Sequence, residues 1–338
     1  MELMLGSKPF DEAILHLPPT LRERLVSLPE NLRAQCREIR MRAAGPLTLT
    51  TAAGTMFLAE SGRPTHLYRE PCFRLRSEAL AEILRCLCDY SIHSYAEDIV
   101  RGFLTLPGGH RAGICGTAVV QGGAVVSVRC VSSINLRIAR EIPGAAAELC
   151  ERIYANSSAS GQLPGIIISG APGSGKTTLL RDLALRLSSG MCGSYRRVAI
   201  VDERGELAGV RDGVPCCNVG ANTDVLTGYP KGEGILLALR SLAPELIVCD
   251  ELGGGADADA LEAGLHAGVS FAASVHAGCV EEVYARPVAR RLLTMGAFTW
   301  LAQLEGPARP CMLREVVHVE DCRGTARRAQ AMEARLCE

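Results

Sequence analysis

The stretch GAPGSGKTT, residues 170–178, decides how this chain folds. It matches the pattern GxxxxGK(S/T), and it stands between the apolar run Ile166–Ser169 and a segment where Leu180, Leu183 and Leu187 recur at helical spacing. A strand, this loop and a helix in that order predict a phosphate-binding loop, whereas a glycine-rich turn before an unrelated helix is the alternative. The predicted nucleotide-binding residues are Gly170, Ala171, Pro172, Gly173, Ser174, Gly175, Lys176, Thr177 and Thr178.

Each residue type in this loop has a physical reason to be there. Glycines let backbone N–H groups turn inward around phosphate oxygens, and the start of the following helix adds its partial positive charge. We expect Lys176 to reach the β- and γ-phosphates of ATP and the Thr177 hydroxyl to ligate Mg²⁺. The expected cofactors are therefore ATP and Mg²⁺.

A second apolar run, ELIVCDE, ends in two carboxylates at Asp250 and Glu251. The end of a parallel strand lies at the sheet edge where open α/β sheets bind ligands, so Asp250 is predicted to hold Mg²⁺ through water. Glu251 is predicted to orient and deprotonate the attacking water. A solvated acidic strand end is the alternative, and the neighbouring phosphate-binding loop argues against it.

Two more strand-like segments end in polar residues. VAIVDERGELAG places Asp202, Glu203 and Glu206 after a strand, as a second carboxylate cluster that can face the nucleotide or its Mg²⁺. FAASVHAG ends at His276, which can sense the γ-phosphate or a water molecule. A lone histidine at a strand end is also a common structural hydrogen-bonding residue, and the sequence leaves both readings open.

The periodicity of the chain changes near its middle. Leu80, Ile83, Leu84 and Leu87 predict a helix with one buried face, and TAVVQGGAVVSV predicts a hairpin that turns at Gly122 and Gly123. The order of a helix followed by strands indicates an α+β domain at 1–155, and NSSASGQLP at 156–164 is the expected linker. Strand-like runs alternating with helices over 165–338 predict an α/β, RecA-like domain with a mostly parallel sheet.

Composition limits the partners and the compartment. The 338 residues carry 36 Lys+Arg and 37 Asp+Glu, a formal net charge of −1, so no global positive field attracts nucleic acid. The 15 cysteines are scattered, many in apolar runs, which indicates buried thiols in a reducing cytosol. The sequence shows neither a signal peptide nor an apolar run long enough to span a bilayer. We expect a cytoplasmic protein that docks on a membrane complex.

These motifs, taken in order, resemble the stage III sporulation protein AA family, which is itself similar to the ATPases of type II and type IV secretion systems. In the C-terminal half the motifs are LLRDLA, VDERGELAG, NTDVLTGYPKGEG, LRSLAPELIVCDELG and GVSFAASVHAG. In the N-terminal half they are EIRMRAAGPL, DIVRGFLTLPGGHRAGICG and SSINLRIARE. The resemblance therefore covers nearly the whole chain.

The resemblance implies roles that the residues alone do not. The segment around Asp202 resembles the family's Asp box and His276 its His box, while Asn222 stands where an arginine is expected. The resemblance implies an ATP-hydrolysing motor that forms a homo-oligomer, expected to be a hexamer. The implied partners are membrane-embedded stage III sporulation channel proteins between mother cell and forespore. Secretion ATPases complete a neighbour's nucleotide site with arginines of the N-terminal domain, for which the candidates are Arg137, Arg140 and Arg111. A solvated arginine on a strand is the alternative for each.

Two rival functions share the predicted fold. A RecA-like nucleic-acid motor could use Arg286, Arg290 and Arg291 with the tail 323–335 as a basic patch, although only 4% of the residues are aromatic, which leaves little for base stacking. A small-molecule kinase is disfavoured because no separate acceptor-binding lid is apparent.

Overall fold

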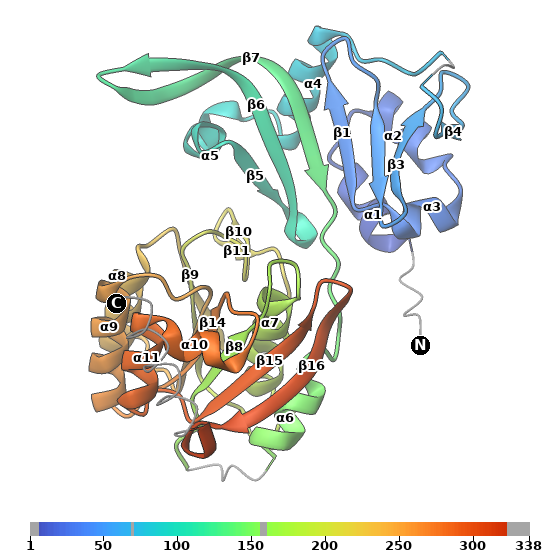
Figure 1. The fold of residues 1–338 in the computed structure, drawn as a ribbon. Helices are drawn as coiled ribbons and strands as arrows, with labels where there is room; N and C mark the ends of the chain where they lie inside the picture. Colours follow the sequence, from blue (N-terminus) through green and yellow to red (C-terminus); the bar gives the residue numbers. More distant parts are fainter. Residues whose placement is uncertain (1–6, 69–70, 156–160, 323–338) are drawn as a thin grey trace, which may run out of the picture. The chain divides into compact units, whose positions relative to one another are not determined.

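The structure is a computed structural model, and it describes residues 7–68, 71–155 and 161–322. The chain divides into two compact units, Met1–Arg140 and Glu141–Glu338, which are described separately below (Figure 1). Among the described residues, no helix is long and apolar enough to cross a membrane.

The N-terminal unit is an α+β fold around an antiparallel sheet of order β4-β3-β2-β1-β7-β6-β5. Its strands are β1 (Glu38–Arg42), β2 (Thr48–Thr51), β3 (Gly54–Leu58), β4 (Pro64–Thr65), β5 (Phe103–Leu106), β6 (His110–Gln121) and β7 (Ala124–Arg137). Its α-helices are α1 (Lys8–Ile14), α2 (Pro19–Val26), α3 (Glu30–Gln35), α4 (Ser77–Leu87) and α5 (Ala96–Arg101).

Two sequence predictions for this unit are confirmed and one is wrong. Helix α4 buries Leu80, Ile83, Leu84 and Leu87, and the β6–β7 hairpin turns at residues 122–123. The predicted order of a helix before the strands fails because β1, β2 and β3 precede α4. These strands have only four or five residues each, and charged residues alternate with apolar ones in β1, so no apolar run signals them.

The C-terminal unit is built on a sheet of order β12-β9-β13-β14-β8-β15-β16, in which every pair is parallel except β15 with β16. The strands are β8 (Ile166–Ser169), β9 (Val198–Asp202), β12 (Thr223–Thr227), β13 (Leu246–Cys249), β14 (Ser270–Val275), β15 (Trp300–Gly306) and β16 (Arg309–His318). The helices are α6 (Ala147–Ile153), α7 (Lys176–Ser188), α8 (Lys231–Ser241), α9 (Gly255–His266), α10 (Val280–Ala285) and α11 (Pro287–Thr294). The short strands β10 (Val210–Arg211) and β11 (Val214–Pro215) pair with each other beside it.

Helices cover both faces of this sheet, because its buried strands alternate apolar side chains between two cores. One core joins Ile167 and Ile247 to α8, α9 and α11, while the other joins Ile168 and Val248 to α6 and α7 (Figure 1). The α/β prediction with a mostly parallel sheet is confirmed. The antiparallel β15–β16 hairpin and the edge strand β12 were not predicted.

The division of the chain differs from the expected linker at 156–164. Helix α6 lies before that stretch, yet its Leu149, Cys150 and Ile153 belong to the core formed with α7. The C-terminal unit therefore begins at Glu141, and α6 is part of it rather than of the N-terminal domain. Residues 156–160 of the expected linker lie outside the described residues.

Candidate functional site

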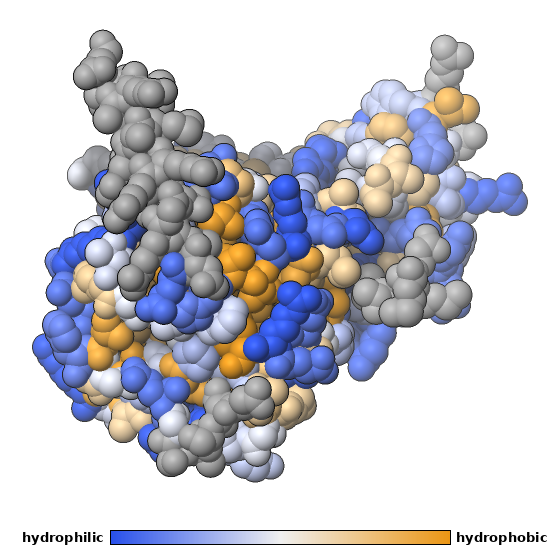
Figure 2. Space-filling model, turned by 60° about the horizontal axis from the view of Figure 1, so that its bottom comes forward, coloured by the Kyte–Doolittle hydropathy of each residue, from blue (hydrophilic) through white to orange (hydrophobic). Residues whose placement is uncertain are grey.

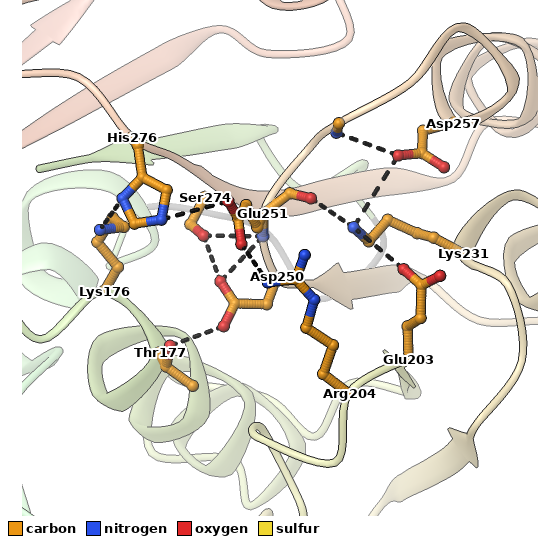
Figure 3. A network of polar contacts seen from close by, with 11 residues as sticks. Lys176, Thr177, Glu203, Arg204, Lys231, Asp250, Glu251, Asp257, Ser274 and His276 are labelled. Atoms are coloured by element: carbon orange, nitrogen blue, oxygen red, sulfur yellow. Dashed lines mark hydrogen bonds and ion pairs between the residues drawn. The ribbon is translucent and has the colours of Figure 1, made fainter. Parts of the chain in front are cut away.

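The candidate site lies where β8, β9, β13 and β14 end. These strands run parallel, so their carboxyl ends meet at one edge of the sheet, as expected for ligand sites in α/β folds. Lys176 follows the loop after β8, Asp250 and Glu251 follow β13, and His276 follows β14. Figure 3 shows these side chains turned toward one another.

The phosphate-binding loop needs its glycines. Gly173 and Gly175 adopt φ of 78° and 92°, in the left-handed region where only glycine is free of steric cost. A Cβ on Gly170 would lie 2.4 Å from Ser174 Oγ, and one on Gly175 would lie 2.4 Å from Cys311 Sγ. Ser174 is fully buried and its Oγ has no hydrogen-bond partner. The tight loop and its orphaned polar atom fit a bound polyanion.

Backbone carbonyl groups of the phosphate-binding loop hold the side chain of Lys176 in place. Its Nζ donates to the carbonyl oxygens of Gly170 at 2.8 Å and Ala171 at 3.0 Å, and it lies 3.0 Å from His276 Nδ1. Burial lowers the pKa of Lys176 despite the opposing effect of Asp250 and Glu251. The ammonium charge is thus incompletely compensated, and a phosphate would supply the missing negative charge.

Thr177 and Asp250 already form the pair that a P-loop uses to hold Mg²⁺. The Thr177 hydroxyl donates to Asp250 Oδ2 at 2.7 Å. The other oxygen, Oδ1, accepts from the Ser274 hydroxyl and from the backbone N–H of Glu251. Oxygen donors of this kind suit Mg²⁺, which takes few protein ligands and keeps its water molecules. The two residues fit the ion that the sequence analysis assigned to them.

Glu251 contacts three other side chains of the site. Its Oε2 accepts from Arg204 Nη1 at 2.7 Å, and its Oε1 lies 3.3 Å from His276 Nε2. Its backbone φ of 38° lies in the left-handed region, and its carbonyl oxygen accepts a hydrogen bond from Lys231 Nζ. A strained residue fixed by its neighbours is typical of functional sites.

Asp202 differs from its expected role. It borders the same pocket as Asp250 and Glu251, but only 2% of the residue is exposed. Its Oδ1 accepts from the N–H groups of Glu206 and Leu207, and its Oδ2 from those of Ala208 and Gly209. The expectation that Asp202 faces the nucleotide is therefore corrected: its carboxylate holds the following loop, because four backbone donors there need an acceptor.

Glu203 and Glu206 line the pocket with Lys231. Glu203 Oε2 lies 3.8 Å from Lys231 Nζ, which also lies 3.9 Å from Asp257 Oδ2 (Figure 3). Lys231 therefore ties the ends of β9 and β13 to the start of α9. A catalytic role for Glu203 or Glu206 stays a prediction.

The candidate arginines of the N-terminal unit have different surroundings. Arg137, with 65% of its side chain exposed, lies 3.6 Å from Glu38 Oε1 at the end of β7. Arg111 is its neighbour across the β6–β7 pair and stacks on the Phe103 ring. Arg140 instead donates to the carbonyl oxygens of Arg33 and Cys36, and burial lowers its pKa. Arg140 is therefore committed to its own unit, which leaves Arg137 and Arg111 as candidates.

The basic patch of the nucleic-acid reading is weaker than its sequence indicated. Arg291 pairs with Asp259 and Glu262, each at 2.7 Å, so its charge is compensated locally. The tail 323–335 lies outside the described residues. Asn222, where an arginine was expected, donates from Nδ2 to the Arg196 carbonyl oxygen at 3.0 Å, which is a structural role.

Sequence reasoning missed Arg204 and Ser274 as site residues. Ser274 lies inside a buried strand with no motif around it, and the parallel pairing of β13 with β14 brings it beside Asp250. Arg204 stands between acidic neighbours in the Asp box, where an arginine first suggests a local ion pair. Lys231 did carry a signal, because lysine is rare in this chain, where arginine supplies most of the positive charge.

The chain is similar to known proteins over most of its length. Residues 14–325 match the family model described as "Sporulation stage III, protein AA". The chain is 34% identical over 301 residues to the Stage III sporulation protein AA of Bacillus subtilis (strain 168), covering 89% of this chain and 92% of that one. A plant protein, SEEDLING PLASTID DEVELOPMENT 1 of Arabidopsis thaliana, is 28% identical over 159 residues, covering 46% of this chain and 22% of its own.

Among solved structures, the X-ray structure of the Legionella pneumophila ATPase DotB is similar, with a TM-score of 0.50 and 18% identity. The match covers 85% of this chain and 76% of DotB, and at that identity it shows a shared fold and nothing about activity. The family match spans most of both units, and by this measure the chain belongs to the sporulation stage III protein AA family.

Proposed function

We propose that this chain binds and hydrolyses ATP with Mg²⁺ and works as the motor of a sporulation export or assembly complex. The observation that carries the proposal is the constellation at the sheet edge. Lys176 in its glycine loop, the Thr177–Asp250 pair at 2.7 Å and the adjacent Glu251 lie within one polar network (Figure 3). These are the groups that phosphoryl transfer to water requires.

Binding of ATP starts with an exchange of partners at Lys176. Its Nζ leaves the carbonyl oxygens of Gly170 and Ala171 and meets the phosphate oxygens instead. Thr177 and Asp250 are the residues that would hold the metal ion. Mg²⁺ supplies charge neutralisation on the phosphates when it is bound.

Hydrolysis then needs a base beside the γ-phosphate. Glu251 follows Asp250 directly, so a carboxylate at that position lies next to the metal-binding pair. Glu251 accepts the proton of the attacking water, and His276, at 3.3 Å from it, helps to orient the carboxylate.

We further propose that the chain works as a hexameric ring, in which Arg137 completes the site of a neighbouring copy. Its exposed guanidinium is tied only to Glu38, across 3.6 Å, among the contacts described for it. Exposed ion pairs of this kind are weak, so the arginine is available to a stronger anion.

A mixing experiment tests the ring. Arg137→Ala should bind ATP but hydrolyse it about 10³- to 10⁵-fold more slowly, the contribution of an arginine finger, while Lys176→Ala should not bind. Mixing the two variants should restore part of the activity, because some interfaces then pair an intact pocket with an intact arginine. Arg40→Ala, which removes the other arginine on Glu38, is the matched control. No recovery after subunit exchange is confirmed would contradict Arg137 in trans and move the search to Arg111.

The proposed partners are the membrane-embedded stage III channel proteins, which this chain would contact from the cytoplasm. On the face drawn in Figure 2, hydrophobic residues form a band among hydrophilic ones, and the exposed apolar side chains of the C-terminal unit include Met191, Tyr195 and Met312. Apolar surface of this kind supports a partner-binding role. Capture of channel subunits by Glu251→Gln from sporulating cells tests it, and capture of nucleic acid alone would favour the rival motor.

A further inference from the structure

Arg204 contacts the proposed base, yet it has no part in the function as proposed so far. Its Nη1 donates to Glu251 Oε2 at 2.7 Å. Arg204 lies in the loop after β9, two residues beyond Asp202. Because β9 and β13 are neighbours in the sheet, its side chain reaches the end of β13. This contact occupies Glu251 Oε2, one of the two oxygens that could accept the hydrogen bond of an attacking water. The contact therefore keeps Glu251 from its proposed task.

The loop that carries Arg204 is fixed from two sides. Asp202 accepts four backbone hydrogen bonds from residues 206–209. Arg181, on the same helix as Lys176 and Thr177, donates to the carbonyl oxygens of Glu206 at 2.8 Å and Leu207 at 2.6 Å. Arg204 is thus presented at a fixed place relative to the phosphate-binding loop.

Its side chain, in contrast, is held only lightly. The side chain of Arg204 is 67% exposed and that of Glu251 36% exposed. Ion pairs with this exposure contribute little to stability, so the pair does not serve mainly to hold the fold together. A guanidinium binds phosphate oxygens in the same forked geometry as a carboxylate, and a terminal phosphate carries more negative charge. The arginine can therefore exchange Glu251 for a phosphate.

The same network links Arg204 to the loop lysine. Lys176 Nζ lies 3.0 Å from His276 Nδ1, and His276 Nε2 lies 3.3 Å from Glu251 Oε1, so the four side chains form one chain of contacts (Figure 3). Bound ATP offers phosphate oxygens to Lys176 and Arg204, the two cations at the ends of this series of contacts. Of the two side-chain contacts described for the Glu251 carboxylate, only the one with His276 then remains, and Oε2 can accept a hydrogen bond from the attacking water.

We propose that Arg204 is the γ-phosphate sensor of this site: it restrains Glu251 in the nucleotide-free protein and moves to the γ-phosphate of ATP, which releases the base. The inference rests on the proposed function, because it assumes that ATP binds at Lys176. ADP lacks the group that attracts Arg204. The chain's own loop therefore supplies a cation for the γ-phosphate, independently of any arginine from a neighbouring copy.

The test compares two nucleotides by calorimetric titration with Mg²⁺: ADP and an ATP analogue with a β,γ-imido bridge, which is not hydrolysed. In Arg204→Ala the affinity for the analogue should fall by about 10- to 100-fold, the size of a charge-assisted hydrogen bond, while the affinity for ADP stays at the parent value. The affinity of Arg204→Lys for the analogue should lie between those of the parent and Arg204→Ala, because lysine keeps the charge but loses the forked pair of N–H donors. Arg152→Ala, which removes an exposed ion pair with Glu148 on α6, is the matched control and should change neither affinity.

A second variant tests the restraint on Glu251. Glu251→Gln removes the carboxylate charge that competes for Arg204, so it should bind the analogue more tightly than the parent and ADP equally well. Equal losses for both nucleotides in Arg204→Ala, or no loss for either, would overturn the inference while the proposed function stood. A parent protein that binds neither nucleotide would overturn both.

Discussion

The ends of β9 and β13 are alike in sequence, but their aspartate carboxylates make different contacts. Both strands are apolar, lie side by side in parallel and run into an Asp-Glu pair. At Asp202 the next residues fold back and place four N–H groups around the carboxylate, whereas Asp250 keeps one oxygen for Thr177. The backbone that follows a carboxylate thus decides whether it holds a loop or remains available for a metal ion.

The largest expected effect is at Lys176, the cation of the phosphate-binding loop. Lys176→Ala removes the one mobile ammonium that meets the β- and γ-phosphates, so tight ATP binding should disappear in a calorimetric titration. Lys8→Ala, in the exposed pair with Glu12, is the control and should bind as the parent does. Unchanged ATP affinity in Lys176→Ala would rule out the loop as a phosphate cradle.

Substitutions of Glu251 and Glu203 compare the ends of β13 and β9 by their effect on the rate of ATP turnover. Glu251→Gln keeps the side-chain shape and loses the base, so ATP should bind while turnover falls by about 10²- to 10⁴-fold, the contribution of general base catalysis. Glu203→Gln is the matched variant, because Glu203 follows Asp202 as Glu251 follows Asp250. Its loss in steady-state turnover should be clearly smaller. A larger loss in Glu203→Gln would place the base at the end of β9.

Substitutions of Asp202 and Asp250 compare the same two strand ends by their effect on the free energy of unfolding. Asp202→Ala leaves buried N–H groups without an acceptor, so the free energy of unfolding should fall by about 2–5 kcal/mol. Asp250→Ala removes a half-buried acceptor from Thr177 and Ser274 and should cost less. Denaturant titration followed by circular dichroism measures both. An Asp202→Ala protein as stable as Asp250→Ala would show that the loop contacts are dispensable.

The sequence predicted what depends on local pattern. The strand, loop and helix around Lys176, the apolar strands that end at Asp250 and His276, and the helix at Leu80 all have periodicity that one short window reveals. The role of Asp202 depends on how the next seven residues turn back on it, which no pattern of residue types records. Arg204 contacts Glu251, and Ser274 contacts Asp250, only because the strands that precede them pair in the sheet.

The unit boundary escaped prediction for a similar reason. The segment 156–164 is small and polar, and it resembles a linker in composition. Helix α6, before it, packs on α7 through Leu149 and Ile153, and Asp182 on α7 accepts from the N–H groups of Gly144 and Ala146. Composition marks a loop, but only these tertiary contacts show to which unit the preceding helix belongs.

The central claim is that β13, and not β9, presents the metal-binding carboxylate, and the Mg²⁺ dependence of ATP affinity tests it most directly. ATP is titrated into the parent, Asp202→Asn and Asp250→Asn, each with Mg²⁺ and with a chelator. The parent and folded Asp202→Asn should bind ATP more tightly with Mg²⁺, and Asp250→Asn should lose that gain. A gain that survives in Asp250→Asn and is lost in a folded Asp202→Asn would contradict the account.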